Sequence, residues 1–194
     1  MYQSFSERIA GNPGSYMAGP DSREQLYRKY RPRLVVFCRN MTGCAIEEAE
    51  DLAQDVLEKA FARHREYNSR WAYSTWLFSI ARNRCIDVHR RRDRRSDANF
   101  PIPGGHADDV LTIVPHGGPG PEEQVLQVEL QDFVRQYIES LGGSDRAIAF
   151  LHWYEDMKYA DIGKVLAMPV GTVKYRVFRI KDGLRHAMEE YHGR

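Results

Sequence analysis

An arginine-rich segment directly follows an aromatic one between Thr75 and Arg95, in the stretch TWLFSIARNRCIDVHRRRDRR. Its charged half contains seven arginines and two aspartates, namely Arg82, Arg84, Arg90, Arg91, Arg92, Arg94 and Arg95 against Asp87 and Asp93. Guanidinium groups donate hydrogen bonds to phosphates, and aromatic rings stack on unpaired bases. The pattern therefore indicates either a core helix with a solvated cationic end or a helix whose far end binds a polyanion.

A thiol and an imidazole lie four residues apart in the same stretch, at Cys85 and His89. On a helix the two side chains share one face, which suits metal ligation or thiol chemistry. Two ligands are too few for a site, and no other Cys/His pair in the chain has ligand spacing. We therefore expect no metal, no cofactor and no catalytic residue, and we expect Cys85 to be a small buried side chain.

A second concentration of positive charge lies between Val170 and Arg185. It consists of Lys174, Arg176, Arg179, Lys181 and Arg185, with Asp182 as the one acidic residue. Lysine and arginine side chains bind phosphates and can donate to guanine in the major groove. A cationic helix face is often merely solvated, so its surroundings decide the interpretation.

Those surroundings have the pattern of a helix-turn-helix. Apolar residues repeat at helical spacing before Pro169, at Tyr159, Ile162, Val165 and Leu166, and after it, at Val170, Val173, Val177, Ile180 and Leu184. Because the residue before a proline avoids the α conformation, the pattern predicts two helices joined by a short turn. The second helix of such a motif lies in the major groove, so we expect this face to bind DNA.

The strongest helical signal in the chain lies between Glu47 and Arg65. Its apolar residues form an unbroken i, i+3, i+4, i+7 stripe of Ala49, Leu52, Ala53, Val56, Leu57, Ala60 and Phe61. The opposite face carries Glu47, Asp51, Gln54, Asp55 and Glu58. Asp51 and Asp55 repel each other only weakly at this spacing, so the acidic face is either solvated or binds a basic partner.

The charge pattern divides the chain into two helical parts. Helices are expected over Arg23–Met41, kinked or broken at Pro32, and from about Tyr73 into the arginines. Between Arg95 and Arg135 there is no lysine or arginine, and PIPGG and PHGGPGP interrupt any long helix. We predict an all-α protein with a flexible lead-in at 1–22, a first domain at 23–95, an acidic linker at 96–123 and a second domain at 124–194.

The overall composition is that of a soluble globular protein, with 42% hydrophobic and 28% charged residues and a net charge of +1. No apolar run approaches the roughly 20 residues that span a bilayer, and no signal peptide opens the chain. The three cysteines, Cys38, Cys44 and Cys85, have no CxxC spacing, which is typical of a reducing compartment. These features predict a cytoplasmic protein without membrane insertion.

The motifs resemble those of a known family. DLAQDVLEKAF followed by YSTWLFSIARNRCIDVHRRR resembles region 2 of bacterial sigma factors of the extracytoplasmic-function group. SLGGSDRAIAFLHWYEDMKYADIGKVLAMPVGTVKYRVFRIKDGLR resembles their region 4. The resemblance covers roughly Glu24–Arg95 and Val125–Met188 and implies two helical domains that bind core RNA polymerase and promoter DNA. An anti-sigma factor is a further partner that the resemblance implies.

The resemblance also implies a role for each surface. The positions matching the family's −10 contacts are Tyr67, Asn68, Ser69, Arg70, Trp71, Tyr73, Arg82, Asn83, Arg84, Arg90 and Arg91. Those matching its −35 helix are Thr172, Lys174, Tyr175, Arg176, Phe178 and Arg179. Those matching the face that docks on the β′ clamp helices are Asp51, Gln54, Asp55 and Glu58, while the second domain is expected at the β flap.

Several positions depart from the family pattern. Leu141-Gly142-Gly143 stands where Leu-Pro is usual, which should loosen the turn, and Gly163 replaces an alanine at a cost of about 1 kcal/mol in helix propensity. Tyr175 replaces a serine, and Trp71 makes the −10 loop unusual. A helix-turn-helix regulator that binds an operator without polymerase is the alternative interpretation, but it leaves WLFSIARN and the acidic helix face unexplained.

Overall fold

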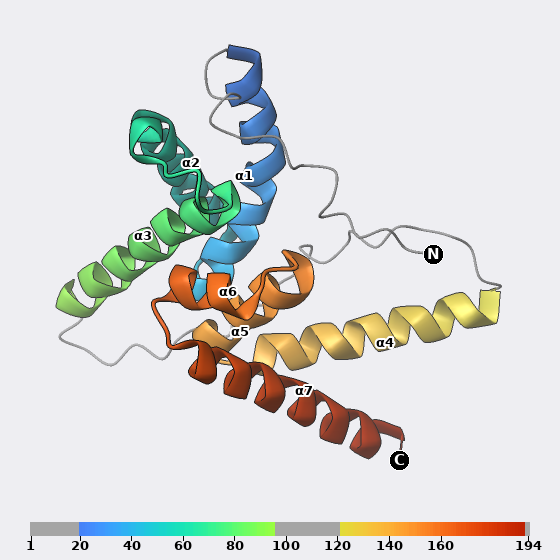
Figure 1. Ribbon diagram of the computed structural model, residues 1–194. Helices are drawn as coiled ribbons and strands as arrows, with labels where there is room; N and C mark the ends of the chain where they lie inside the picture. Colours follow the sequence, from blue (N-terminus) through green and yellow to red (C-terminus); the bar gives the residue numbers. More distant parts are fainter. Residues whose placement is uncertain (1–19, 96–120, 193–194) are drawn as a thin grey trace.

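The computed structural model describes residues 20–95 and 121–192, and within these ranges all regular structure is helical (Figure 1). The first lobe consists of α1 (Pro20–Thr42), α2 (Ile46–Ala62), the 3₁₀ turn η3 (His64–Glu66) and α3 (Tyr73–Arg95). The second consists of α4 (Pro121–Ser140), α5 (Gly143–Ala149), the π-helical turn η4 (Phe150–Tyr154), α6 (Tyr159–Leu166) and α7 (Val170–His192). The predicted all-α class is confirmed. Most of the predicted lead-in and linker, 1–19 and 96–120, lies outside the described residues.

Helix α1 continues through Pro32 instead of breaking there. Proline removes one backbone hydrogen bond and clashes with the preceding turn, a cost of about 3 kcal/mol. Pro32 itself is exposed, while Leu34, Phe37 and Cys38 of the next turns are fully buried. Burial of three large or medium apolar side chains is of the size needed to offset that cost, at about 1.5–3 kcal/mol for each large one.

Helix α2 buries the predicted stripe. Its buried residues are Ala49, Leu52, Ala53, Val56, Leu57 and Ala60, and Phe61 is half-buried against the same core. The periodic part of the predicted Glu47–Arg65 helix is therefore correct, although the helix ends at Ala62 and a separate 3₁₀ turn follows. Helix α3 completes this lobe with Leu77, Phe78, Ala81 and Cys85 fully buried.

The second lobe is built around the predicted helix-turn-helix. Helix α6 buries Ile162, Val165 and Leu166, and α7 buries Val173, Val177 and Ile180. Helix α4 packs on α7, where the Tyr137 hydroxyl donates to the Ile180 carbonyl at 2.9 Å. A Cβ on Gly183 would lie 2.4 Å from that hydroxyl, so the glycine permits the close approach of the two helices. None of the described helices is long and apolar enough to cross a membrane.

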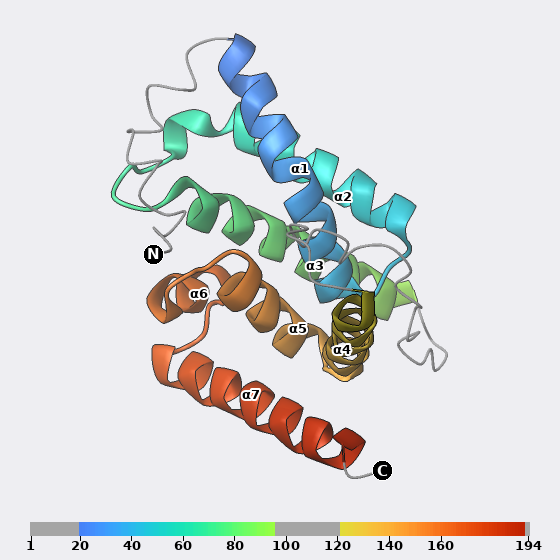
Figure 2. The same ribbon diagram turned by 90° about the vertical axis from the view of Figure 1, so that its right-hand side faces the viewer.

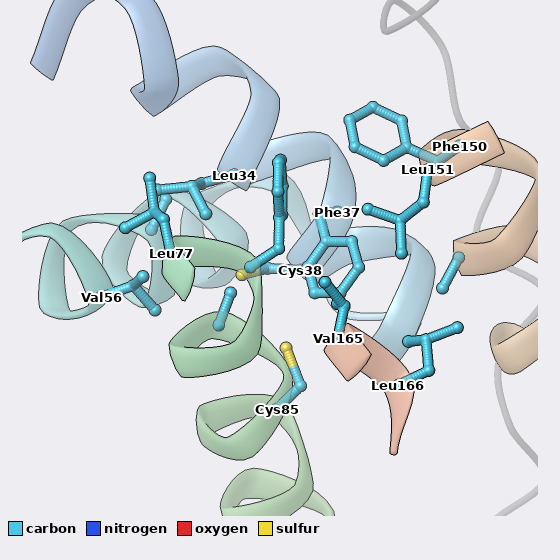
Figure 3. Close-up of a cluster of buried hydrophobic side chains, with 14 of the residues drawn as sticks. Leu34, Phe37, Cys38, Val56, Leu77, Cys85, Phe150, Leu151, Val165 and Leu166 are labelled. Carbon is cyan, nitrogen blue, oxygen red and sulfur yellow. The ribbon is translucent and has the colours of Figure 1, made fainter. Parts of the chain in front are cut away.

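The two lobes share one hydrophobic core. Figure 2 shows α5 and α6 between the first lobe and α7, and buried side chains from both lobes meet there (Figure 3). Phe150 of η4 lies with its ring centroid 6.3 Å from that of Phe37 in α1 and 6.0 Å from that of Phe78 in α3. The sequence predicts two separate domains and gives no sign of this joint packing.

Candidate nucleic-acid interface

The loop between η3 and α3 is a tight turn held by its own hydrogen bonds. The Asn68 Oδ1 atom accepts from the Arg70 backbone N–H at 3.0 Å, and the Trp71 N–H donates to the Asn68 carbonyl at 3.1 Å. The Tyr67 hydroxyl then donates to the Trp71 carbonyl at 2.6 Å. These bonds fix the loop without covering Trp71, whose side chain is left 40% exposed.

An aromatic cluster supports this loop from below. The ring centroids of Tyr67, Tyr73 and Trp76 lie 5.4 to 5.5 Å from one another, and Tyr73 also packs on Tyr30 of α1 at 5.5 Å. Tyr73 is only 5% exposed, and its burial raises the pKa of its hydroxyl. The sequence assigns Tyr73 to DNA, but in this fold its ring supports the loop and has no free face for a base.

A recess of about 280 Å³ opens between the loop and α3. Its lining combines two indole rings, Trp71 and Trp76, with the polar side chains of Glu66, Asn68, Thr75 and Ser79 and, from the second lobe, Lys164. Aromatic walls with a few polar groups are what a single unstacked base requires. The recess therefore has the chemistry expected of a base-capture site.

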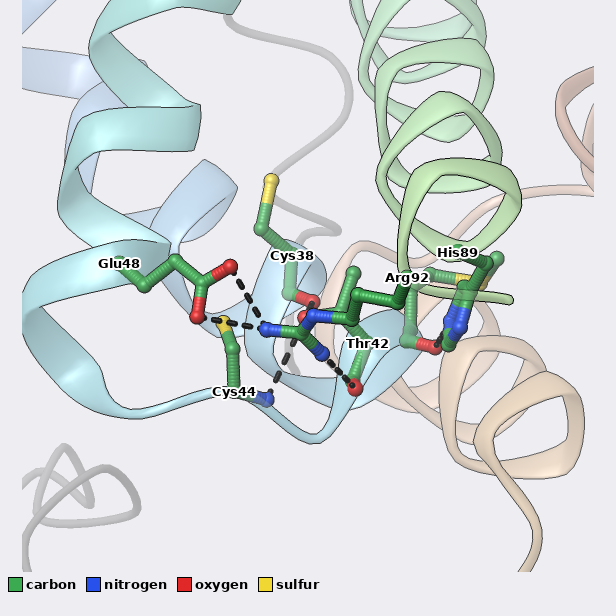
Figure 4. Close-up of polar contacts among 7 residues, drawn as sticks. Cys38, Thr42, Cys44, Glu48, His89 and Arg92 are labelled. Carbon is green, nitrogen blue, oxygen red and sulfur yellow. Dashed lines mark hydrogen bonds and ion pairs between the residues drawn. The ribbon is translucent and has the colours of Figure 1, made fainter. Parts of the chain in front are cut away.

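The arginines of α3 divide into two groups. Arg84 forms an ion pair with Asp55 of α2, and Arg92 binds Glu48 through two contacts of 2.6 Å and the Thr42 carbonyl at 3.4 Å (Figure 4). These two hold α3 against the α1–α2 junction, so the expected DNA role of Arg84 is not supported by its position. Arg90, Arg91 and Asn83 are exposed, and Arg82 is half-buried and donates to the Asn83 Oδ1 atom at 3.2 Å.

Cys85 and His89 have structural environments. Cys85 is fully buried beside Cys38, and its hydrogen bond together with burial raises the pKa of the Cys38 thiol, which keeps it protonated and a poor nucleophile. A ring nitrogen of His89 lies 3.0 Å from the Met41 carbonyl (Figure 4). Among the described residues, no group of three or more potential ligands could hold a metal.

The acidic face of α2 is largely available. Asp51, Gln54 and Glu58 are exposed, and Gln54 donates to Glu58 at 3.1 Å. Asp55 differs from the others because it is half-buried between Lys59, at 3.2 Å, and Arg84. A side chain held between two cations has less charge to offer a partner, so Asp55 is less suited to the predicted docking role than the three exposed members.

The turn of the helix-turn-helix depends on a glycine. Ala167 ends α6 in the left-handed conformation, with φ of 51°, and the Met168 N–H donates back to the Gly163 carbonyl at 2.8 Å. A Cβ on Gly163 would lie 2.8 Å from the Met168 carbonyl oxygen, closer than atoms normally approach. The glycine that costs helix propensity is therefore what lets the chain turn so tightly.

The outer face of α7 carries the predicted reading residues. Lys174, Tyr175, Phe178 and Arg179 are exposed and Thr172 is half-buried, with Phe178 as much as 64% exposed. Arg176 instead forms an ion pair with Asp145 of α5 at 3.0 Å, so its predicted DNA contact competes with an internal one. An exposed phenylalanine among cations on a helix that follows a tight turn fits a groove-binding surface.

Two contacts between the lobes have no counterpart in the sequence-based predictions, and one of them involves the recess. Lys164 of α6 has its ammonium 3.6 Å from the centroid of the Trp71 ring, and Glu155 pairs with Arg33 of α1 at 3.2 Å. Both partners are more than 90 positions away along the chain, so no local pattern indicates them. Only the packing of the second lobe on the first brings them together.

These features define a class: a two-lobed helical DNA-binding protein with a helix-turn-helix in its second lobe. Comparison with known proteins identifies the family within this class. Residues 26–95 match the family Sigma-70 region 2, and residues 134–182 match Sigma-70, region 4. The chain is 29% identical over 161 residues to the ECF RNA polymerase sigma factor SigW of Bacillus subtilis, covering 83% of this chain and 86% of that protein. It is 32% identical over 152 residues to the RNA polymerase sigma-H factor of Pseudomonas aeruginosa, covering 74% of each.

A solved structure agrees with this relationship. The sigma factor RpoE from Bartonella quintana, in complex with the anti-sigma factor NepR, superimposes with a TM-score of 0.61 and 26% identity over 86% of this chain and 96% of that one. CnrH, at 16% identity and a TM-score of 0.59, shares the fold. The chain belongs to the sigma-70 family, within its extracytoplasmic-function group. It is an alternative sigma factor, which binds core RNA polymerase and directs promoter-specific transcription initiation.

Proposed function

We propose that three separate surfaces of this sigma factor divide the work of initiation. The recess beside Trp71 captures a −10 base, the outer face of α7 reads the −35 duplex, and the acidic face of α2 docks on polymerase. The observation that carries the proposal is that each surface is open to a partner and has the chemistry that its target requires. The recess is aromatic and polar, the outer face of α7 is cationic, and the face of α2 is acidic.

At the −10 element, a base flipped from the non-template strand enters the recess. Unstacking costs a few kcal/mol, which stacking on Trp71 and hydrogen bonds to the polar lining offset. Asn83 lies further along α3, where Arg82, Arg90 and Arg91 supply cationic groups for the adjoining backbone. The amide can therefore contact the strand where duplex gives way to single strand.

At the −35 element, α7 enters the major groove with its N-terminal half. Lys174 and Arg179 are suited to guanine edges and phosphates, while Tyr175 and Phe178 provide apolar contact with thymine methyl groups. Thr172 lies closest to the turn, where the helix N-terminus also attracts phosphate. The bulk of Tyr175, where the family usually has serine, predicts an altered −35 preference.

The remaining partners follow from the third surface and from the family. Asp51, Gln54 and Glu58 dock on the β′ clamp helices, and the second lobe docks at the β flap. Phosphodiester bond formation stays with the polymerase, so the sigma factor itself is not an enzyme and acts in the cytoplasm. The likeness to RpoE bound to NepR supports an anti-sigma factor as a further partner.

Replacing Asn83 with alanine is expected to slow promoter melting about tenfold, since one hydrogen bond is worth about 0.5–1.5 kcal/mol. Binding to core polymerase should not change, because Asn83 lies on α3, whereas the proposed docking residues lie on α2. Permanganate footprinting measures the melting and a pull-down measures the binding. Gln136→Ala, which removes an exposed amide on α4, is the control. Normal melting by Asn83→Ala would show that the amide has no role there.

Replacing Arg179 with alanine is expected to weaken discrimination at one −35 position by about 1–3 kcal/mol, the value of a good side-chain contact with a base. Run-off transcription from promoters with single −35 changes measures this. Arg185→Ala is the matched control, because Arg185 lies on the same helix further from the turn and pairs with Asp182. Unchanged promoter selection by the Arg179 variant would contradict the assignment.

The experiment that tests the whole proposal is reconstituted run-off transcription with core polymerase over a promoter library. Transcription that depends on the sigma factor and on both promoter elements supports the proposal. Tight sequence-specific binding to duplex DNA by the protein alone, with no stimulation of polymerase, would favour an operator-binding regulator instead.

A further inference from the structure

The recess beside Trp71 carries one acidic side chain, that of Glu66 at the end of η3. Glu66 is exposed, and no hydrogen bond or ion pair engages its carboxylate among the residues that the structure describes. Because like charges repel, a free carboxylate on a surface that binds phosphates is unfavourable unless the nucleic acid offers it a hydrogen-bond donor. The family resemblance assigns Glu66 no contact with DNA, so its role has to follow from the recess itself.

The neighbouring polar groups of the recess already have defined hydrogen-bonding roles. The Asn68 Oδ1 atom accepts from the Arg70 backbone N–H at 3.0 Å, which leaves the Nδ2 group of Asn68 as a donor. The Ser79 Oγ atom donates to the Thr75 carbonyl at 2.7 Å, so toward a ligand it can only accept. The first-lobe side of the recess therefore combines acceptors at Glu66 and Ser79 with a donor at Asn68.

This combination suits bases that carry an exocyclic amino group. A base turned out of the stack is read at its Watson–Crick edge. Adenine and cytosine have an amino group there next to a ring nitrogen that accepts, and guanine has an amino group and a ring N–H next to a carbonyl oxygen. Each can donate to the carboxylate while accepting from Asn68. Thymine has no amino group, and its one ring N–H lies between two carbonyl oxygens, so one of these oxygens would face the carboxylate.

Lys164 does not supply a counter-charge for Glu66. Its ammonium lies 3.6 Å from the centroid of the Trp71 ring and pairs with Asp161 of the same helix at 3.2 Å. Lys164 also comes from the second lobe, whereas the three hydrogen-bonding groups described above all belong to the first. The donor and acceptor pattern of the recess is therefore a property of the first lobe alone.

We propose that Glu66 determines which base the recess accepts, by taking a hydrogen bond from the exocyclic amino group of adenine, cytosine or guanine and disfavouring thymine. Asn68 supports this selection by donating to the acceptor beside that amino group. Stacking on Trp71 is available to every base, so the ring supplies affinity and the carboxylate supplies discrimination. The inference rests on the proposed role of the recess at the −10 element.

The first part of the test locates the captured base. Holoenzyme assembled from the full-length chain and core polymerase is bound to labelled promoter DNA whose non-template strand is unpaired at the −10 element, and fluorescence anisotropy measures its affinity. An abasic site is introduced at each −10 position in turn. At the captured position it should weaken binding about tenfold for the native chain, the value of one stacked base, and should have little effect on Trp71→Ala.

The second part removes the amino group of the base at that position. Uracil replaces cytosine, or hypoxanthine replaces adenine or guanine, and thymine is compared with all of them. The native chain should bind the altered DNA about tenfold more weakly, because a hydrogen bond to a charged group is lost. Glu66→Gln should bind both DNAs about equally, since an amide can turn to donate or to accept. The comparison is a ratio within one variant, so a general change in affinity cancels.

Glu24→Gln is the matched control. It makes the same chemical change at an exposed position of α1 that does not line the recess, so it should discriminate as the native chain does.

The outcomes distinguish a failure of this inference from a failure of the proposed function. If no −10 position depends on Trp71, the recess captures no base, and both are overturned. If one position depends on Trp71 but thymine is preferred there, or if Glu66→Gln discriminates as strongly as the native chain, only the role of Glu66 is overturned.

Discussion

Phe150→Ala is expected to lower the free energy of unfolding by about 3–5 kcal/mol, the usual cost of removing a buried phenylalanine. Phe150 is buried between Phe37 and Phe78 of the first lobe and stacks on Tyr154 at 5.0 Å, so truncation leaves a cavity where both lobes meet. Because the two lobes share one core, we expect one unfolding transition for the whole protein, and this transition should shift to lower urea concentration. Urea denaturation followed by circular dichroism measures the change.

Phe178→Ala is the matched control for this prediction. Phe178 is the same residue type in the same lobe but is exposed on α7, so its removal should change stability by no more than about 0.5 kcal/mol. Equal effects of the two variants, or a loss of stability confined to one of two separate transitions, would mean that the lobes fold on independent cores.

Arg33→Met is expected to destabilise the protein by about 2–3 kcal/mol at neutral pH, because it leaves the buried Glu155 carboxylate without its cation. The value is set at or below the usual range for a broken buried pair, since Arg33 itself is 29% exposed. Methionine keeps most of the arginine's apolar stem, so packing changes little. Denaturation at several pH values measures the difference from the native chain.

The deficit of Arg33→Met should depend on pH in a defined direction. Burial raises the pKa of Glu155 above its ordinary value of 4.5, although Arg33 and Lys29 act to lower it. Stability from this group is therefore fully present below pH 4.5 and is lost as pH rises through the raised folded pKa. Without Arg33 that pKa rises further, so the deficit should be small in acid and grow toward neutral pH.

Arg28→Met serves as the control for the ion pair. Arg28 pairs with Glu24 on the same helix at 2.5 Å, but both side chains are largely exposed, so its loss should cost at most about 0.5 kcal/mol at any pH. A deficit in Arg33→Met that is flat with pH would show that Glu155 is not the group responsible.

Local periodicity accounts for the features that the sequence predicts well. The α2 stripe and the turn at Pro169 depend on residues within one or two helical turns of each other, and 3.6-residue spacing or a proline is enough to indicate them. The same holds for the arginine-rich half of α3. At Pro32 the sequence leaves a kink or a break open, and the structure excludes the break, because tertiary burial on both sides outweighs the lost hydrogen bond.

For several single side chains, the structure shows an internal contact where the sequence predicts an external partner. Arg84 and Asp55 are each predicted to bind a different macromolecule, yet in the fold they bind each other. Arg176 forms an ion pair with Asp145, and the side chain of Tyr73 is buried. Position on a helix face is readable from sequence, but whether a charged or aromatic side chain reaches outward depends on what packs beside it.

The sequence by itself determined the helical class, the two lobes, the helix-turn-helix and the family, because these follow from periodicity and from motifs of contiguous residues. Only the tertiary structure decided how the lobes meet. The contacts of Gly143 with α1, of Glu155 with Arg33 and of Lys164 with Trp71 join residues that no local pattern relates. Such contacts arise from the three-dimensional packing of segments that are distant in the sequence.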